Sequence, residues 1–109
     1  MPSNVAQKNF TIAAAGTVST GVDLGGSYIA ALLLPNNLVP TNITFQGSMD
    51  NVTYYAIYDS SGAAVTLSTV AASTAVAIDM SFTFGFPYLK LVAGTTQTNG
   101  AIITALLKA

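Results

Sequence analysis

Short runs of strand-forming residues, separated by clusters of turn-forming residues, recur along this sequence. Val, Ile, Thr, Tyr and Phe dominate the runs, and Gly, Pro, Asn, Asp and Ser dominate the clusters between them, as expected of strands and turns. The predicted strands, about eight by this pattern, cover residues 9–15, 18–24, 28–34, 42–48, 52–59, 63–69, 75–80 and 88–93, with 101–108 as a candidate ninth.

The pattern predicts an all-β fold. The segments 71–77 and 101–107 contain Ala and Leu, which are good helix formers, but their Ser, Thr and β-branched residues favour strands. About eight short strands suit a single antiparallel β-sandwich, jelly-roll-like, with immunoglobulin-like topology as the alternative. We expect one domain over residues 1–109, in which 1–8 form an extended N-terminal arm. The strand order does not follow from the pattern.

Two turns are predicted between neighbouring strands. In the segment 48–51, Asp50 and Asn51 can bond their own backbone and tolerate left-handed conformations, so we expect a tight hairpin there. The segment 59–62 has the same chemistry. We therefore expect the strands 52–59 and 63–69 to be antiparallel neighbours.

Charge is scarce in this chain. Charged residues make up 6% of it, as three Lys and four Asp, and the formal net charge is −1, whereas soluble domains carry about 25% charged residues. Such a chain exposes neutral and apolar surface, which promotes association. We therefore expect other protein to cover part of this surface, including further copies of the chain in a homo-oligomer, either a dimer or a trimer.

The residue inventory argues against catalysis. The chain has no His, Cys, Glu or Arg, which supply most general acids, bases and activated nucleophiles. The segment 59–62 resembles the Asp-Ser/Thr-Gly turn of aspartic proteases, but an extra Ser breaks the spacing. Lys90 lies among apolar residues and is expected to face solvent or a partner. We expect no catalytic residue, and a protein that is not an enzyme.

Other ligand classes are also disfavoured. The four aspartates, Asp23, Asp50, Asp59 and Asp79, are isolated in the sequence and are expected to cap turns, so we predict neither a metal site nor a cofactor. Three dispersed lysines cannot neutralise a nucleic-acid backbone. The apolar stretches are shorter than the ~20 residues of a spanning helix, and no secretory leader is evident. We expect no nucleic-acid or membrane partner, and synthesis in a cytoplasm.

Aromatic residues supply the candidate partner interface. Period-two alternation places Tyr54 and Tyr58 on one strand face and Tyr55 on the other. Packing inside the sandwich is the main alternative for these tyrosines, and a sugar-stacking platform is a second. Phe84 and Phe86 alternate onto one face, where the end of the core is the favoured location. The candidate interface comprises Tyr54, Tyr55, Tyr58, Phe84, Phe86 and Tyr88.

Several segments together resemble small virion proteins of tailed phages. They are Val22-Asp23-Leu24-Gly25-Gly26, Leu34-Pro35, Ile43-Thr44-Phe45-Gln46-Gly47-Ser48-Met49-Asp50, Tyr58-Asp59, and Tyr88-Leu89-Lys90-Leu91 before Gly94-Thr95, and the resemblance spans about residues 21–107. It implies a head decoration, or cement, protein with a β-sandwich fold. Such a protein binds the major capsid protein on the outer surface of the virion capsid, and has no catalytic residues to carry over.

Two rival functions remain open from the sequence: a binding module of a phage fibre or tail, and a minor shell or spike protein of another virus. A receptor- or carbohydrate-binding β-sandwich module of a phage fibre or tail would use exposed tyrosines as its binding platform. A glycan-dependent response would distinguish this role from that of a cement subunit, which cross-bridges neighbouring major capsid proteins.

Overall fold

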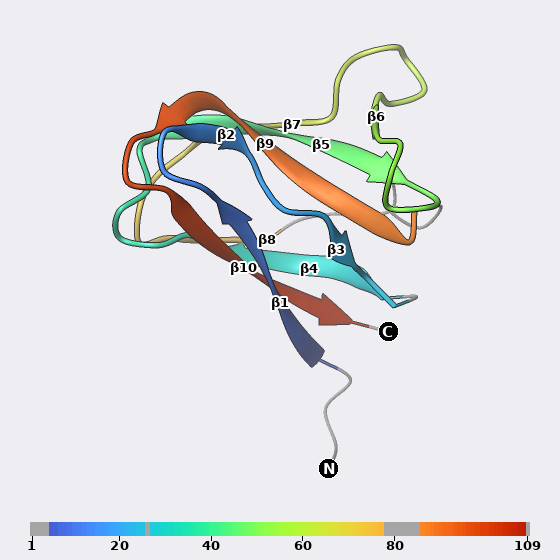
Figure 1. Cartoon of the computed structure of the whole chain (residues 1–109), viewed down its shortest axis with the longest axis horizontal. Helices are drawn as coiled ribbons and strands as arrows, with labels where there is room; N and C mark the ends of the chain where they lie inside the picture. Colours follow the sequence, from blue (N-terminus) through green and yellow to red (C-terminus); the bar gives the residue numbers. More distant parts are fainter. Residues whose placement is uncertain (1–4, 26, 78–85, 109) are drawn as a thin grey trace.

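The computed structural model describes residues 5–25, 27–77 and 86–108, and these form strands without any helix (Figure 1). The strands are β1 (Val5–Ile12), β2 (Gly16–Val18), β3 (Val22–Asp23), β4 (Tyr28–Leu33), β5 (Thr41–Ser48), β6 (Tyr55–Ala56), β7 (Thr66–Val70), β8 (Ala75–Ala77), β9 (Tyr88–Gln97) and β10 (Ala101–Lys108). The expected all-β class is therefore confirmed.

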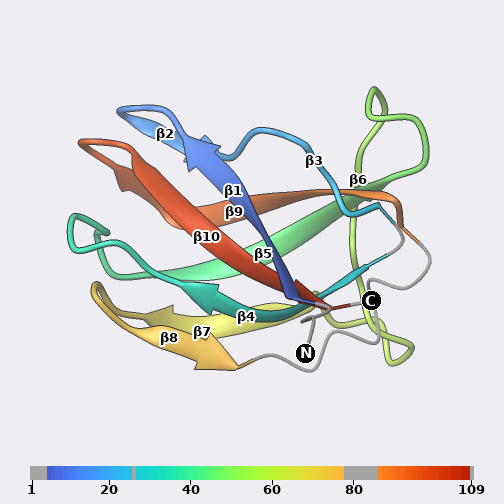
Figure 2. The same ribbon diagram turned by 90° about the horizontal axis from the view of Figure 1, so that it is seen from below.

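The strands form two sheets. Sheet A has the order β1-β10-β4-β8, and sheet B has the order β2-β9-β5-β6, with β3 also paired to β9 and β7 to β5. All pairs are antiparallel. Figure 2 shows the sheets from below, with β10 and β4 in one and β9 and β5 in the other.

The strand order is that of a jelly roll. The chain folds back on itself as one antiparallel ribbon, in which β1 pairs with β10, β2 and β3 with β9, β4 with β8, and β7 with β5. Successive pairs of this ribbon alternate between the sheets, as in a jelly roll. In the immunoglobulin-like alternative the first two strands are neighbours in one sheet, whereas here β1 pairs along its length with the last strand. The jelly-roll prediction is confirmed.

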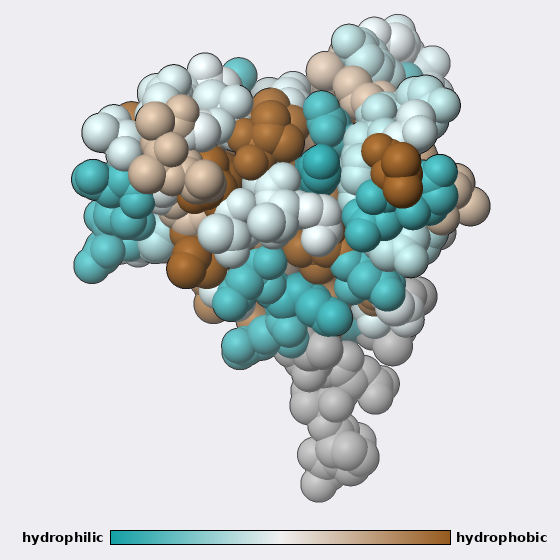
Figure 3. Space-filling view, in the orientation of Figure 1, coloured by the Kyte–Doolittle hydropathy of each residue, from teal (hydrophilic) through white to brown (hydrophobic). Residues whose placement is uncertain are grey.

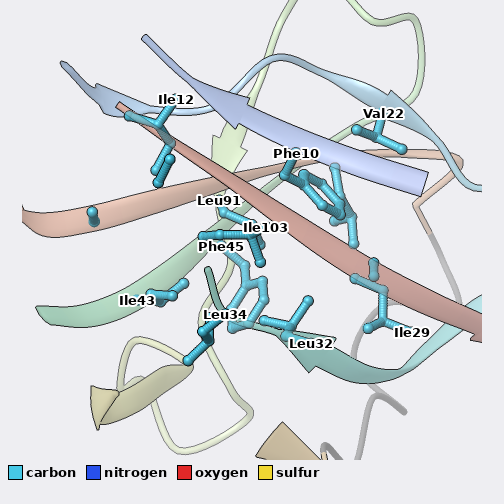
Figure 4. Close-up of a cluster of buried hydrophobic side chains, with 14 of the residues drawn as sticks. Phe10, Ile12, Val22, Ile29, Leu32, Leu34, Ile43, Phe45, Leu91 and Ile103 are labelled. Atoms are coloured by element: carbon cyan, nitrogen blue, oxygen red, sulfur yellow. The ribbon is translucent and has the colours of Figure 1, made fainter. Parts of the chain in front are cut away.

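The core lies between the sheets and follows the alternation of each strand. On β10, Ile103 and Leu107 point inward, whereas Ile102 is 54% exposed on the outer face of sheet A. Phe10 from sheet A and Phe45 from sheet B are both buried in this cluster (Figure 4). Each such side chain contributes about 1.5–3 kcal/mol when fully buried. The core thus fixes which face of each strand remains for contact with other molecules.

The predicted strand 18–24 is interrupted. Ser19 forms a bridge with Ile12 of β1, and the Thr20 N–H donates to the Thr11 carbonyl over 2.9 Å. The buried Ser19 hydroxyl accepts a bond from the Leu91 N–H at 2.9 Å. The contacts with Ile12 and Thr11 draw residues 19 and 20 towards β1, while Ser19 stays bonded to Leu91 of β9, so two short strands, β2 and β3, replace the single predicted one.

The expected pairing of 52–59 with 63–69 is wrong for most of its length. β6 and β7 both pair with β5, at Gly47↔Tyr55 and Ile43↔Leu67 for example. Between them, residues 57–65 form a flap held by the Tyr58↔Ala64 bridge. The predicted hairpin at 48–51 does form, as β5 and β6, although its loop extends to residue 54.

The two ends of the chain meet in sheet A. The segment 5–8, expected as part of an extended arm, is extended but paired with residues 105–108 of β10, and residues 1–4 lie outside the described part. The segment 101–108 is a strand rather than the alternative helix. Its inward alanines, Ala101 and Ala105, are 4% and 0% exposed, because sheet B packs closely against them.

Candidate interaction surface

The β5–β6 loop, residues 49–54, begins with two interlocked side-chain caps. The buried Ser48 hydroxyl accepts the N–H groups of Asp50 and Asn51 at 3.2 and 2.9 Å, and donates to Asp50 Oδ1 at 3.0 Å. Asp50 Oδ1 in turn accepts the N–H groups of Val52 and Thr53 at 2.9 and 3.0 Å. The N–H groups of Thr53 and Val52, with the Ser48 hydroxyl, lower the Asp50 carboxyl pKa below 3.8.

Tyr54 closes the loop over the outer face of sheet B. Its hydroxyl donates to Asn51 Oδ1, and its ring lies under the Lys90 ammonium, 4.4 Å from Nζ to the ring centroid. Asn51 adopts a φ of 62°, a left-handed conformation that Asn tolerates. Burial, followed by the negative charge of Tyr88 and Asp50 when ionised, raises the Tyr54 pKa. The loop is therefore anchored at both its start and its end.

The approach of Tyr54 requires a glycine on the neighbouring chain segment. A Cβ atom at Gly21 would lie 2.6 Å from Asn51 Oδ1 and would overlap the Tyr54 hydroxyl. Gly21 directly precedes β3, which pairs with β9. The fold of the β5–β6 loop thus depends on a residue far away in the sequence.

Large exposed hydrophobic side chains are concentrated at this end of the sandwich. Met49 is 71% exposed, Val52 80%, Tyr55 67% and Tyr58 60%. We name these residues the tip surface. Figure 3 shows a small hydrophobic spot at the end of the molecule where β5 ends, and larger hydrophobic areas over the middle of the same face. The other large exposed hydrophobic residues described, Val18, Leu33 and Ile102, lie in β2, β4 and β10.

The structure places most of the candidate aromatic residues around the end of β5. Tyr55 pairs with Gly47, and Tyr88 pairs with Ser48. The Phe86 ring lies so close to Gly47 that a Cβ atom there would be 2.5 Å from it. Tyr55 and Tyr58 are exposed, whereas Tyr54, Phe86 and Tyr88 are half-buried. Phe84 lies outside the described residues.

Sequence reasoning missed Met49 and Val52. Met49 falls within the predicted turn, and Val52 opens the predicted strand 52–59. The available signal was the Asp50-Asn51 pair between them, because a cap at Asp50 holds Val52 in the loop rather than in a strand. An apolar residue on each side of such a cap must point into solvent or towards a partner.

The other aspartates have structural roles where they are described. Asp23 Oδ1 accepts the Gly25 N–H at 2.8 Å, and Asp59 Oδ1 accepts the Ser61 and Ala63 N–H groups at 2.9 and 3.1 Å. The Ser61 hydroxyl and the Ala63 N–H lower the Asp59 pKa. Asp79 lies outside the described residues.

Other kinds of site are not evident in the described part of the chain. Within residues 5–25, 27–77 and 86–108, no three acidic, His or Cys side chains gather as metal ligands would. Over the same residues there is no helix with the length and hydrophobicity to cross a membrane. Tip residues, rather than a charged or metal-binding cluster, are therefore the candidate functional site.

Comparison with known proteins shows the fold. No protein-family model matches the chain, and no curated protein matches its sequence. Among solved structures, the crystal structure of SPBc2 prophage-derived protein YomS is similar, with a TM-score of 0.57 over 100% of this chain and 98% of that chain. The sequences are 11% identical. The likeness is one of fold over the full length of both chains.

Proposed function

We propose that this protein is a structural protein of a phage virion, a decoration or cement subunit. It binds the outer surface of the capsid after synthesis in the host cytoplasm, and cross-bridges neighbouring major capsid proteins. The observation that carries this proposal is the tip surface, which exposes Met49, Val52, Tyr55 and Tyr58 on a chain with seven charged residues, three Lys and four Asp.

Two further observations support a phage structural role. The described strands have the jelly-roll order, which recurs in viral capsid domains. The similar solved structure belongs to a prophage-derived protein. Each agrees with the sequence resemblance to head decoration proteins, which was drawn from other features of the chain.

The mechanism of such a subunit is hydrophobic burial repeated by symmetry. Contiguous apolar patches on a soluble protein usually mark contact sites. A modest contact made by every copy around each symmetry axis adds up to a strong lattice, because the contacts act together. Self-association into a dimer or trimer would add to this effect by presenting several tip surfaces at once.

The proposed role is non-enzymatic. Lys90 lies over the Tyr54 ring. The Asp50 and Asp59 carboxylates accept hydrogen bonds from their own turns. These groups serve the fold, so no metal, cofactor or nucleic acid enters the proposal.

A second candidate function is carbohydrate binding by a fibre or tail module. The exposure of Tyr55 and Tyr58, at 67% and 60%, favours it, because sugars stack on exposed aromatic rings. Replacement of both tyrosines by Ala would abolish a glycan-dependent response if this function is the true one. The same substitutions would only weaken binding to capsids in the primary proposal, because Met49 and Val52 remain.

Sedimentation with empty heads of the phage that carries the gene tests the proposal. We expect the protein to pellet with heads and to stay bound in about 1 M salt, because contacts driven by charge are screened there and apolar contacts are not. Light scattering after size-exclusion chromatography should show a small oligomer. A monomer that does not sediment with heads would contradict the proposal. Release of the protein from heads near 1 M salt would also contradict it.

A further inference from the structure

We propose that Met49 and Val52 are the anchor of the tip surface, and that they insert into an apolar pocket on the partner protein whose rim carries no acidic group opposite Asp50. This inference rests on the proposed function and names the contact that performs it. The two side chains are 71% and 80% exposed, more than any other large hydrophobic residue described. They flank Asp50 and Asn51 at the outermost turn of the β5–β6 hairpin.

The loop that carries this pair is ordered before any partner binds. The Ser48 hydroxyl accepts the two backbone N–H groups that follow Met49, and Asp50 Oδ1 accepts the N–H groups of Val52 and Thr53, all over 2.9 to 3.2 Å. Tyr54 fixes the far end of the loop to Asn51. A loop held in its bound conformation loses little conformational entropy on binding, which increases affinity. Such a network beneath two solvent-exposed apolar side chains is what a preformed anchor requires.

The chemistry of the pair selects the class of partner. Met and Val side chains offer no aromatic face for a sugar and no charge for a phosphate, so an apolar protein pocket is what they fit. Met is also enriched at protein interfaces, where its flexible thioether adapts to irregular pockets.

The charge of the tip defines the rim of the pocket. The Asp50 carboxylate accepts its bonds on Oδ1, from Ser48, Val52 and Thr53. It stays ionised at neutral pH without a cation from the partner. Where the rim faces Asp50, an acidic side chain would therefore be repelled, and a neutral or basic one would be accepted. The Lys90 ammonium lies over Tyr54, at the other end of the loop.

Another exposed apolar site provides a matched control. Leu33 of β4 and Ile102 of β10 are 37% and 54% exposed on the outer face of sheet A. They sit in regular strands and are not flanked by a capped loop. They have the same general hydrophobicity as the anchor pair, so they test whether position, rather than exposed apolar area, decides binding.

Binding of purified variants to empty phage heads tests the inference, with the bound fraction measured over a range of protein concentrations. The M49S/V52S variant should bind roughly tenfold more weakly or worse, as expected for a central anchor. The L33S/I102S variant should bind within about threefold of the unmodified protein. Asp50→Ala keeps both anchor side chains but releases the loop, and should weaken binding by about threefold to tenfold.

The outcomes separate this inference from the function on which it rests. Failure of the unmodified protein to bind heads would overturn the proposed function and the inference with it. Binding by the unmodified protein that persists in M49S/V52S would overturn the inference alone. A loss confined to L33S/I102S would assign the contact to sheet A. Melting temperatures of all variants, measured alongside, identify any loss that comes from unfolding.

Discussion

The two ends of β5 differ in the kinds of side chain that they bury and expose. At the start of β5, polar groups are buried, and Gln97 is 0% exposed. Its side-chain oxygen accepts the Val39 N–H at 2.8 Å, and its side-chain nitrogen donates to the carbonyls of Val39 and Thr95 at 3.1 and 3.0 Å. Thr41, which is 3% exposed, accepts the Thr95 N–H at 2.9 Å. Each buried polar atom there has a partner, so this end of β5 is built for stability.

At the far end of β5 the buried polar group is Ser48, which holds the loop in shape, and large apolar side chains are exposed around it. A folded domain gains nothing in stability from an exposed Met or Val, whereas it gains affinity if a partner covers them. The comparison separates the part of the molecule that maintains the fold from the part that is free to bind.

The largest effect is expected at the buried polar end. Gln97→Leu removes three hydrogen bonds and leaves the N–H and carbonyl of the half-buried Val39 without their partner. We expect a loss of about 2–3 kcal/mol in the free energy of unfolding, seen as a lower urea midpoint. The matched control is Gln46→Leu, at a half-buried position on the outer face of β5, which should cost less than about 1 kcal/mol. Equal losses in the two variants would contradict the assignment.

A smaller loss is expected where β5 meets Phe86. Gly47→Ala places a Cβ atom 2.5 Å from the Phe86 ring, which must move or be compressed. Overpacking of this kind costs about 1–3 kcal/mol, and thermal unfolding measures it. In the control Gly94→Ala the obstructing atom is the end of the exposed Asn42 side chain, which can rotate away. Unchanged stability of Gly47→Ala would mean that Phe86 is not held against β5.

Acid should loosen the tip before it unfolds the core. The pKa values of Asp50 and Asp59 lie below 3.8 in the folded protein. The hydrogen bonds to these carboxylates thus stabilise the fold above about pH 4, and that contribution is lost as the pH falls through the lowered pKa values. The protection of amides 50–53 against exchange, measured by NMR relative to an unstructured peptide at the same pH, should fall below this range. Asp50→Asn should remove this change in that loop, and protection that stays constant with pH would argue against the cap.

The smallest effect on stability is expected at the anchor. M49S/V52S should change the free energy of unfolding by no more than about 0.5 kcal/mol, because both side chains are exposed in the free protein. Chemical denaturation checks this value. A loss of unfolding free energy comparable with that of Gln97→Leu would show that these side chains support the fold. It would contradict the proposed difference between the two ends of β5.

The sequence pattern predicted the sandwich but not its local interruptions. The predicted strands 42–48 and 101–108 are observed as β5 and β10 of a jelly roll. The division of 18–24 into β2 and β3 could not be foreseen, because residues 19 and 20 contact β1 while the Ser19 hydroxyl accepts a bond from Leu91, 72 residues away. Propensity and period describe neighbours in sequence, and this bond joins distant ones.

The aromatic residues named from the sequence differ in exposure. Tyr55 and Tyr58 are exposed, whereas Tyr54 is half-buried and closes the loop against Gly21. Met49 and Val52 were not named, since a turn and the start of a strand are ordinary places for them. Their prominence follows from the bonds of Asp50, which keep Val52 out of β6.

A cryo-electron microscopy map of heads saturated with this protein is the most direct test of the account. We expect the map to show the β5–β6 loop facing the capsid, with Met49 and Val52 buried in an apolar pocket of the major capsid protein and the outer face of sheet A in solvent. A map in which Leu33 and Ile102 meet the capsid while the loop points outward would contradict it.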